Sequence, residues 1–133
     1  MRNKSWNYCS KQLKMNHTDA VTEIIKTIPE TKEDFKEFYK TNSPFMVINV
    51  FTRHIKKLIK ENDQQILIKS ILKMNKLYSK GDAALKNAIE NIFVYSLDSF
   101  TFCCEPTYKK MIFNKMSPSL QENYFHQVYK SGI

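Results

Sequence analysis

The chain of 133 residues is poor in the residues that make turns, with two glycines and four prolines. Sandwiches and barrels use both residue types in their many tight turns, so this shortage argues against an all-β fold. Phosphate-binding loops of nucleotide-binding proteins also depend on clustered glycines. Gly81 and Gly132 are far apart in the sequence, so the pattern excludes a glycine-rich nucleotide site.

Cysteine and arginine are also scarce. The three cysteines are Cys9, Cys103 and Cys104, an odd number with two adjacent members, which is unlike a disulfide framework. This usage indicates reduced thiols and predicts a cytoplasmic protein. Arg2 and Arg53 are the two arginines among 21 basic residues. A surface dominated by lysine is less suited to recognising phosphates and bases, which favour the planar guanidinium.

Long hydrophobic runs are absent. The strongest, PFMVINVF at residues 44–51, is too short to span a bilayer, and residues 1–17 lack the apolar core of a secretory signal. An amphipathic helix on a membrane surface is an alternative for residues 44–61. However, residues 44–51 are apolar almost all round, which suits a buried helix better. We therefore expect a soluble protein with no membrane partner.

The residues that are present provide ample material for a core. Hydrophobic residues make up 42% of the chain, with nine phenylalanines and seven tyrosines. The length fits one domain. We predict an all-α, single-domain antiparallel helical bundle of about five to seven helices over residues 1–133, with residues 1–17 forming a short helix or an irregular arm. Met15 is an alternative start, which would make residues 1–14 dispensable.

Capping residues recur at spacings that suit short helices. Ser43-Pro44 and Ser117-Pro118 have the typical order of an N-cap followed by a first-turn proline. The run after Ser43 keeps a helical period of apolar residues as far as Asn62. The expected starts are Thr18 or Asp19 for a helix ended by Pro29, then Thr31, Ser43, Asp63, Asp82, Pro106 and Ser117.

The dipeptide Gly81-Asp82 is expected to join two helices. We predict that Gly81 ends the first helix in the left-handed conformation and that Asp82 caps the next. Such a short joint makes helices 63–80 and 83–102 antiparallel neighbours. Apolar residues cover much of the second helix, including Val94 and Tyr95, so we expect it to be central in the bundle.

Two other segments have apolar faces at helical spacing. In TKEDFKEFYK, residues 31–40, the aromatic residues Phe35, Phe38 and Tyr39 fall on one side of a helix. In the segment after Ser117, the expected apolar stripe consists of Leu120, Tyr124 and Val128, with the adjacent Phe125 as an additional candidate.

Catalytic and metal-binding patterns are weak. Cys103 or Cys104 could act as a nucleophile with His54 or His126 as a base, but no recognised nucleophile motif surrounds either thiol. We favour the simpler explanation that they are small, partly buried thiols near a helix end. The chain has no CxxC or HxxxH pair with the spacing of metal ligands. We predict a protein that is not an enzyme, with no catalytic residue, no metal and no cofactor.

The formal charge is +8, and the basic excess lies outside residues 63–105, where five basic and five acidic residues balance. In RHIKKLIK, residues 53–60, four cations occupy about one face of a helix. A solvated face explains them, and so does a binding face for an acidic partner. A basic nucleic-acid-binding regulator is the alternative. The candidate binding residues are Arg53, Lys56, Lys57, Lys60, Lys109 and Lys110.

The segment LYSKGDAALKNAIENIFVYSLDSF, residues 77–100, resembles small helical bacterial domains found among toxin-immunity genes. There, a leucine-bearing helix ends in Gly-Asp, and the next helix passes through Asn-Ala to an apolar stretch with a leucine and an acidic residue. The matching positions are Leu77, Gly81, Asp82, Leu85, Asn87, Ala88, Ile89, Phe93, Leu97 and Asp98.

This resemblance implies a cytoplasmic immunity protein of the contact-dependent growth inhibition kind. Such a protein binds a cognate toxin domain, which can be a nuclease, and blocks its active site. Immunity proteins against nucleases are frequently acidic, whereas this chain is basic. The resemblance therefore implies a toxin with an acidic contact surface. The matched residues are expected to form the core, so none of them transfers as a binding residue.

Overall fold

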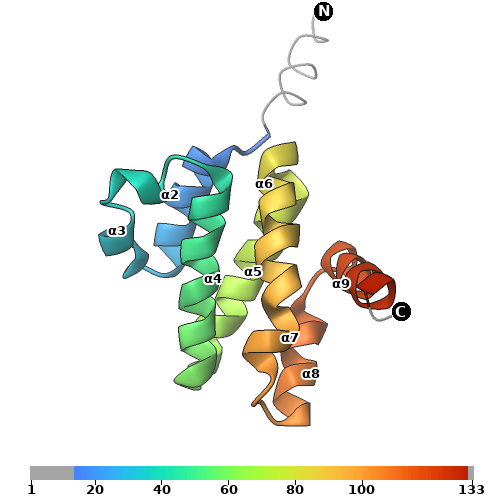
Figure 1. Cartoon of the computed structure of the whole chain (residues 1–133). Coiled ribbons are helices and arrows are strands. Elements are labelled where there is room, and N and C mark those ends of the chain that lie inside the picture. The colour runs from blue at the N-terminus through green and yellow to red at the C-terminus, as the bar shows by residue number, and fades with distance from the viewer. Residues whose placement is uncertain (1–13, 132–133) are drawn as a thin grey trace, which may run out of the picture.

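The computed structural model describes residues 14–131 and confirms an all-α fold. Successive long helices run in alternating directions, and α9 lies to one side of them (Figure 1). The helical segments are α2 (His17–Thr27), α3 (Thr31–Asp34), η1 (Phe38–Lys40), α4 (Pro44–Lys60), α5 (Gln64–Lys80), α6 (Ala83–Ala88), η2 (Ile89–Val94), α7 (Tyr95–Thr101), α8 (Pro106–Lys115) and α9 (Pro118–Ser131). The prediction for residues 1–13 lies outside the described residues.

Side-chain caps explain where most of the long helices begin. Ser43, Asp63 and Asp82 each accept a hydrogen bond from the backbone N–H three residues later, as predicted. For α2 the predicted cap was wrong by two or three residues. Asn16 is the N-cap, and Asp19 instead completes a reciprocal capping box by accepting from the Asn16 backbone N–H.

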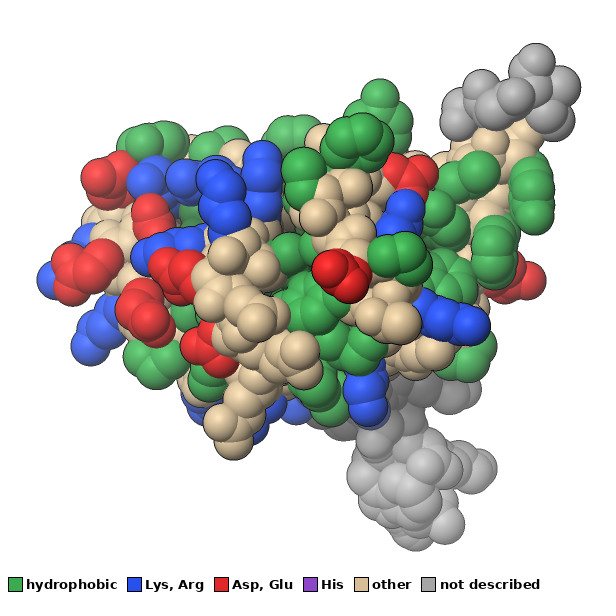
Figure 2. All heavy atoms as spheres, turned by 90° about the horizontal axis from the view of Figure 1, so that it is seen from below, with side chains coloured by type: hydrophobic (Ala, Val, Ile, Leu, Met, Phe, Trp, Pro, Cys, Tyr) green, Lys and Arg blue, Asp and Glu red, His purple; other side chains and the backbone are tan. Residues whose placement is uncertain are grey.

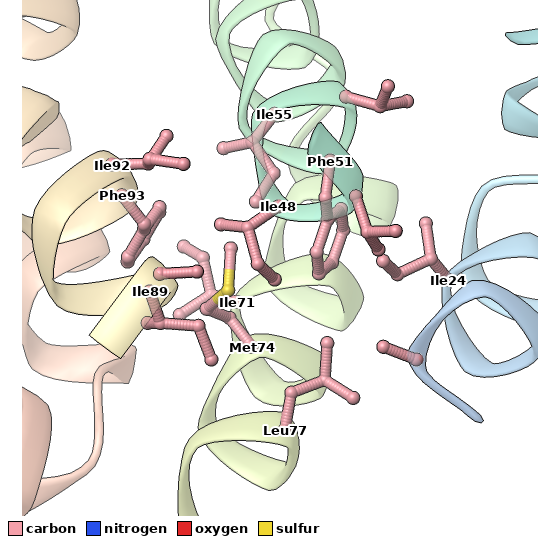
Figure 3. Packing of buried hydrophobic residues seen from close by; sticks show 14 of the residues in the cluster. Ile24, Ile48, Phe51, Ile55, Ile71, Met74, Leu77, Ile89, Ile92 and Phe93 are labelled. Carbon is pink, nitrogen blue, oxygen red and sulfur yellow. The ribbon is translucent and has the colours of Figure 1, made fainter. Parts of the chain in front are cut away.

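The core fills the space between α2, α4, α5 and the continuous helix α6–η2–α7. Side chains from all four point toward one another around Phe51 of α4 and Phe93 of η2, both fully buried (Figure 3). We call these four helices the body. Helix α4 contacts α2, α3, η1, α5, α6 and η2. The most central helix is therefore α4, whereas the helix at residues 83–101 contacts α4 on one side and α9 on another.

The joint between α5 and α6 differs from the prediction at Gly81. The residue has an extended backbone, with φ of −73° and ψ of 157°, so it is not a left-handed cap. The left-handed residue is Asn62, with φ of 58°, in the turn between α4 and α5. Gly81 is instead needed for space, because an added Cβ would lie 2.5 Å from the Leu77 carbonyl oxygen.

The N-terminal segment fastens this joint. The Met15 backbone N–H donates to the Lys80 carbonyl at 2.8 Å, and the Met15 carbonyl accepts from the Asp82 N–H at 2.8 Å. The two bonds form an isolated parallel bridge between Met15 and Gly81. The predicted antiparallel pairing of α5 with the next helix is present, and α5 contacts α6 beside the joint.

The segment at residues 31–40 was predicted incorrectly. It forms a single α-helical turn and a short 3₁₀ turn, and of its three aromatics only Phe35 is buried. Phe38 and Tyr39 are 79% and 56% exposed. Asp34 fixes this segment onto α4, because its carboxylate pairs with His54 Nε2 at 2.7 Å and with Lys40 Nζ at 3.1 Å.

The helices α8 and α9, which we call the C-terminal pair, are less deeply packed than the body. Their buried apolar residues, counting the link between them, are Ile112, Met116 and Leu120. Of the predicted α9 stripe, Leu120 is buried, Tyr124 and Val128 are half-buried, and Phe125 is exposed. Gln127 Nε2 donates to the Glu90 carbonyl at 3.0 Å and so connects α9 to η2.

Candidate partner-binding surface

The four predicted cations of α4 lie on its exposed side. The core takes Phe51, Ile55 and Leu58 from α4, so the intervening positions of the same helix face solvent. Lys57 reaches Glu61 at 4.0 Å, the outer limit of an ion pair. Among the described residues, no acidic partner lies within that limit for the other three, Arg53, Lys56 and Lys60.

Several other lysines have acidic partners and serve the fold. Glu23 of α2 pairs with Lys73 and Lys76 of α5 at 2.5 and 3.2 Å, and with Lys26 in its own helix at 3.7 Å. Hydrogen bonds from Lys73 and then Lys76 lower the pKa of Glu23 from 4.5 to about 2. This ion cluster holds two body helices together, so its lysines are committed to structure.

The α4 cations overlook a hollow at the end of the molecule where α4 and α7 finish. It has a volume of about 630 Å³, and Lys56 and Lys60 stand at one side of it. We call it the thiol hollow because Cys103 and Cys104 line the opposite side. The remaining lining residues are Ile59, Asn62, Gln64, Ser99, Phe100, Glu105, Thr107 and Tyr108.

The two thiols do not have the surroundings of an activated nucleophile. Burial raises the pKa of the Cys104 thiol, which keeps it protonated near neutral pH. His54 is bound to Asp34 on α3, and His126 lines a separate hollow with Tyr78 and Lys86. Neither histidine is among the residues that line the thiol hollow.

Lys109 and Lys110 lie on a second hollow, between α7, α8 and α9. Its volume is about 330 Å³, and its walls are mainly apolar. We call it the aromatic hollow, lined by Leu97, Asp98, Thr101, Pro106, Lys109, Lys110, Ile112, Phe113, Tyr124 and Phe125. The structure thus separates the six predicted cations into an α4 group, of which Lys56 and Lys60 line the thiol hollow, and an α8 group that lines the aromatic hollow.

The α7–α8 connection lines the thiol hollow, and the residues on either side of that connection, Thr101 and Pro106, line the aromatic hollow. The two hollows therefore adjoin the same end of the molecule. Figure 2 views this end and shows lysine and arginine side chains beside exposed hydrophobic ones, with acidic side chains between them. Phe102, in the connection itself, is 82% exposed. We call this end the basic end and define it by Arg53, Lys56, Lys57, Lys60, Phe102, Lys109, Lys110 and the two hollows.

Sequence reasoning missed the aromatic contribution to this surface. Phe125 was assigned to a core stripe, but it is 43% exposed and stacks on Tyr129 with ring centroids 6.0 Å apart. Both residues occupy the same side of α9, four positions apart. That spacing was a readable signal, although it could not distinguish a buried stripe from an exposed one.

The described part of the chain has neither a cluster of metal-binding side chains nor a helix that could span a membrane. No three histidine, cysteine, aspartate or glutamate side chains within residues 14–131 converge in a way that could hold a metal ion. In the same part of the chain, no helix has both the length and the apolar character needed to cross a membrane.

Comparison with known proteins places the chain in a family. No curated protein and no solved structure matches it. Residues 21–130, from the first turns of α2 to the last turn of α9, match the family described as Domain of unknown function (DUF7674). The match covers the body and the C-terminal pair, including both hollows. The chain therefore belongs to the DUF7674 family.

Proposed function

We propose that this chain is a non-enzymatic immunity protein that binds a cognate bacterial toxin domain and occludes its active site with the basic end. The observation that carries this proposal is the contrast between its lysines. Those around Glu23 are paired and hold helices together, whereas Arg53, Lys56 and Lys60 have no acidic partner among the described residues. Cations without a structural task are available to a partner.

The composition of the basic end suits a protein interface. Interfaces draw most of their binding energy from a few aromatic and basic anchors that become desolvated on contact. Phe102 is almost fully exposed in the α7–α8 connection, next in sequence to Cys103 of the thiol hollow. A protein surface that covers Phe102 together with the cations of the basic end would bury aromatic area and satisfy several charges at once.

Charge defines the expected partner. The chain carries +8, so its toxin should present an acidic surface or an acidic cleft at the contact. Complementary charge of this kind speeds association and makes it dependent on ionic strength. The resemblance at residues 77–100 supports the immunity role. Most of its matched residues, such as Leu85 and Phe93, are buried as expected, but Asn87 and Asp98 are exposed, so the expectation that all of them form the core was wrong.

The experiment that tests this function is expression of the product of the gene immediately upstream, alone and together with this chain. We expect the product to be toxic alone, harmless in co-expression and retained by this chain in a pull-down. A product that is not toxic, or a toxic product that this chain neither binds nor neutralises, would overturn the proposal.

A charge-reversal variant identifies the binding face in the same assay. Replacing Arg53, Lys56, Lys57 and Lys60 by glutamate should weaken toxin binding by at least about tenfold, since several charge contacts are reversed together. The matched control makes the same change at four exposed lysines elsewhere that have no acidic partner among the described residues: Lys14, Lys32, Lys69 and Lys80. Equal loss in both variants would indicate a net-charge effect without a defined face.

A basic nucleic-acid-binding regulator is the second candidate, and the row of cations along α4 favours it. Such binding would weaken steeply as salt is raised, because each phosphate contact releases a counterion. The measurement is a fluorescence anisotropy titration of labelled DNA and RNA, both duplex and single-stranded. It is repeated at salt concentrations from about 50 to about 300 mM. Absence of binding at the lowest salt would eliminate this candidate.

A further inference from the structure

The aromatic hollow is a mainly apolar recess that also carries unpaired positive charge. Its wall is a cluster of three rings, in which Phe113 lies 5.4 Å from Tyr124 and 5.3 Å from Phe125, and Tyr124 lies 5.6 Å from Phe125. All three pairs have the edge-to-face geometry that aromatic rings prefer. The cluster therefore forms a defined wall, and its rings support one another.

The acidic group inside the hollow is already used. Tyr124 Oη donates to Asp98 Oδ1 at 2.7 Å. Burial, together with this bond, raises the pKa of Tyr124 to about 12, so the hydroxyl stays protonated and remains a donor at neutral pH. Asp98 accepts this bond and keeps its negative charge, and the two lysines of the lining outnumber it, so the charge of the hollow is positive.

Lys109 and Lys110 supply that charge at the rim. They are consecutive on α8, both exposed, and neither has an acidic partner within 4.0 Å among the described residues. Burial of a charged lysine in a bundle requires a partner, but at a rim the ammonium groups stay hydrated until an anion arrives. The recess thus combines an apolar floor with a positive edge.

The dimensions limit what can occupy the recess. A volume of about 330 Å³ is at the lower end for small-molecule sites, which span about 300–1,000 Å³. It accommodates one or two apolar side chains. Beyond the wall, Phe125 and Tyr129 continue the aromatic surface along α9. A segment bound in the recess could also contact this aromatic strip along α9.

We propose that the aromatic hollow docks an acidic protein segment, which seats an apolar side chain against Phe113, Tyr124 and Phe125 while its carboxylates meet Lys109 and Lys110. The segment belongs to the toxin partner, so this inference deepens the proposed function and rests on it. A second copy of this chain is a poorer occupant, because it also carries +8 and would bring like charge to the rim.

The test is a peptide titration of the full chain, monitored by two-dimensional amide NMR. The probe is a peptide with a leucine–phenylalanine pair flanked by glutamates. One comparison peptide replaces the apolar pair by alanines, and another replaces the glutamates by lysines. We expect the probe to shift the amides of residues 97–113 and 120–129, and to bind at least about fivefold more tightly than either comparison peptide.

Two protein variants locate the site. Lys109→Glu/Lys110→Glu should weaken probe binding by about tenfold, because both rim contacts become repulsive. The control, Lys32→Glu/Lys69→Glu, makes the same charge change at exposed lysines of α3 and α5 and should leave binding within about twofold. Circular dichroism verifies the fold of both. Phe125→Glu is an independent variant of the wall and should weaken the probe to a similar degree.

The outcomes separate this inference from the proposed function. The hollow is overturned as a docking site if the probe binds the rim and wall variants as tightly as it binds the natural chain. It is also overturned if the alanine peptide binds as tightly as the probe. Concentration-dependent self-association that Phe125→Glu abolishes, without probe binding, would assign the hollow to a second copy and also overturn it. If the toxin is neutralised equally by the rim variants, the immunity function stands and the hollow is not its contact. If the probe binds as expected but the upstream product is not toxic, the hollow is supported as a docking site and the proposed immunity function is overturned.

Discussion

The body and the C-terminal pair differ in how they use the same kinds of residue. In the body, large apolar side chains such as Phe51 and Phe93 are completely buried, and lysines such as Lys73 are held by a carboxylate. In the C-terminal pair, Phe125 and Tyr129 are exposed, and Lys109 and Lys110 lie at the rim of a hollow.

The difference teaches that stability and recognition occupy separate parts of this chain. Burial of apolar area is the main favourable term in folding, and it is concentrated around α4. The residues that could anchor a partner lie in the C-terminal pair, where little apolar area is buried on folding. Substitutions in the two regions should therefore have effects of very different size on stability.

The largest effect should come from truncating the body core. Phe51→Ala should lower the free energy of unfolding by about 3–5 kcal/mol, because it leaves a cavity among α2, α4 and α5. The matched change Phe125→Ala should cost about 1 kcal/mol or less, since that ring is 43% exposed. Urea denaturation followed by circular dichroism measures both. Similar losses would contradict the division into two regions.

A smaller effect is expected at the joint within the body. Gly81→Ala should destabilise the fold by about 1–3 kcal/mol, because the new methyl group would lie 2.5 Å from the Leu77 carbonyl oxygen and 2.9 Å from Leu85 Cδ2. The neighbouring change Lys80→Ala affects an exposed side chain and serves as control. A stabilising Gly81→Ala would show that the joint relaxes freely and that glycine there has no steric role.

The observed conformation of Gly81 also shows how much of the fold the sequence could predict. Residues such as Ser43, Asp63 and Asp82 were correctly predicted as caps, because an N-cap depends on a side chain and a backbone N–H only three residues away. The role of Gly81 depends on the Leu77 carbonyl oxygen and the Leu85 side chain, which lie close to it only in the folded joint that Met15 bridges. Local sequence pattern could not reveal that geometry.

The same limit applied to apolar stripes. Period alone predicted the buried side of α4, which carries Phe51 and Ile55, because several helices surround α4. It failed for Phe38 and Tyr39, because a stripe is buried only where another element covers it. The π turn η2 was also not predicted, since its residues have the same apolar pattern as an ordinary helix.

Of the candidate binding surface, the cations were predictable and the hollows were not. Exposure of Lys56 and Lys109 follows from the helical period of their neighbours. The aromatic hollow requires α7, α8 and α9 to meet, which depends on tertiary packing. The split of the six cations between two hollows could therefore be found only in three dimensions.

Acid should weaken the body through Glu23. Its folded pKa of about 2 lies below the ordinary value of 4.5, so its contribution to stability is complete above pH 4.5 and is lost as pH falls toward 2. The partly hydrated position of the cluster screens these charges, so we expect about 1 kcal/mol. Glu23→Gln should be less stable than the natural chain at pH 7, and the two stabilities should converge near pH 2. Equal stability at pH 7 would contradict a structural role for the ion cluster.

The smallest effect on stability should come from the rim lysines, and it completes the comparison of the two regions. Lys109→Ala/Lys110→Ala should change the free energy of unfolding by less than about 0.5 kcal/mol, because neither side chain has an acidic partner among the described residues. Removing two positive charges from a chain of +8 also lessens its self-repulsion. Lys73→Ala is the matched change in the body, where it takes the nearest cation from Glu23 and should cost more. Urea denaturation at low and high salt measures both, and the cost of Lys73→Ala should shrink as salt is raised. A loss at Lys109 and Lys110 equal to that at Lys73 would mean that the rim lysines serve the fold, which would remove the reason to assign them to a partner.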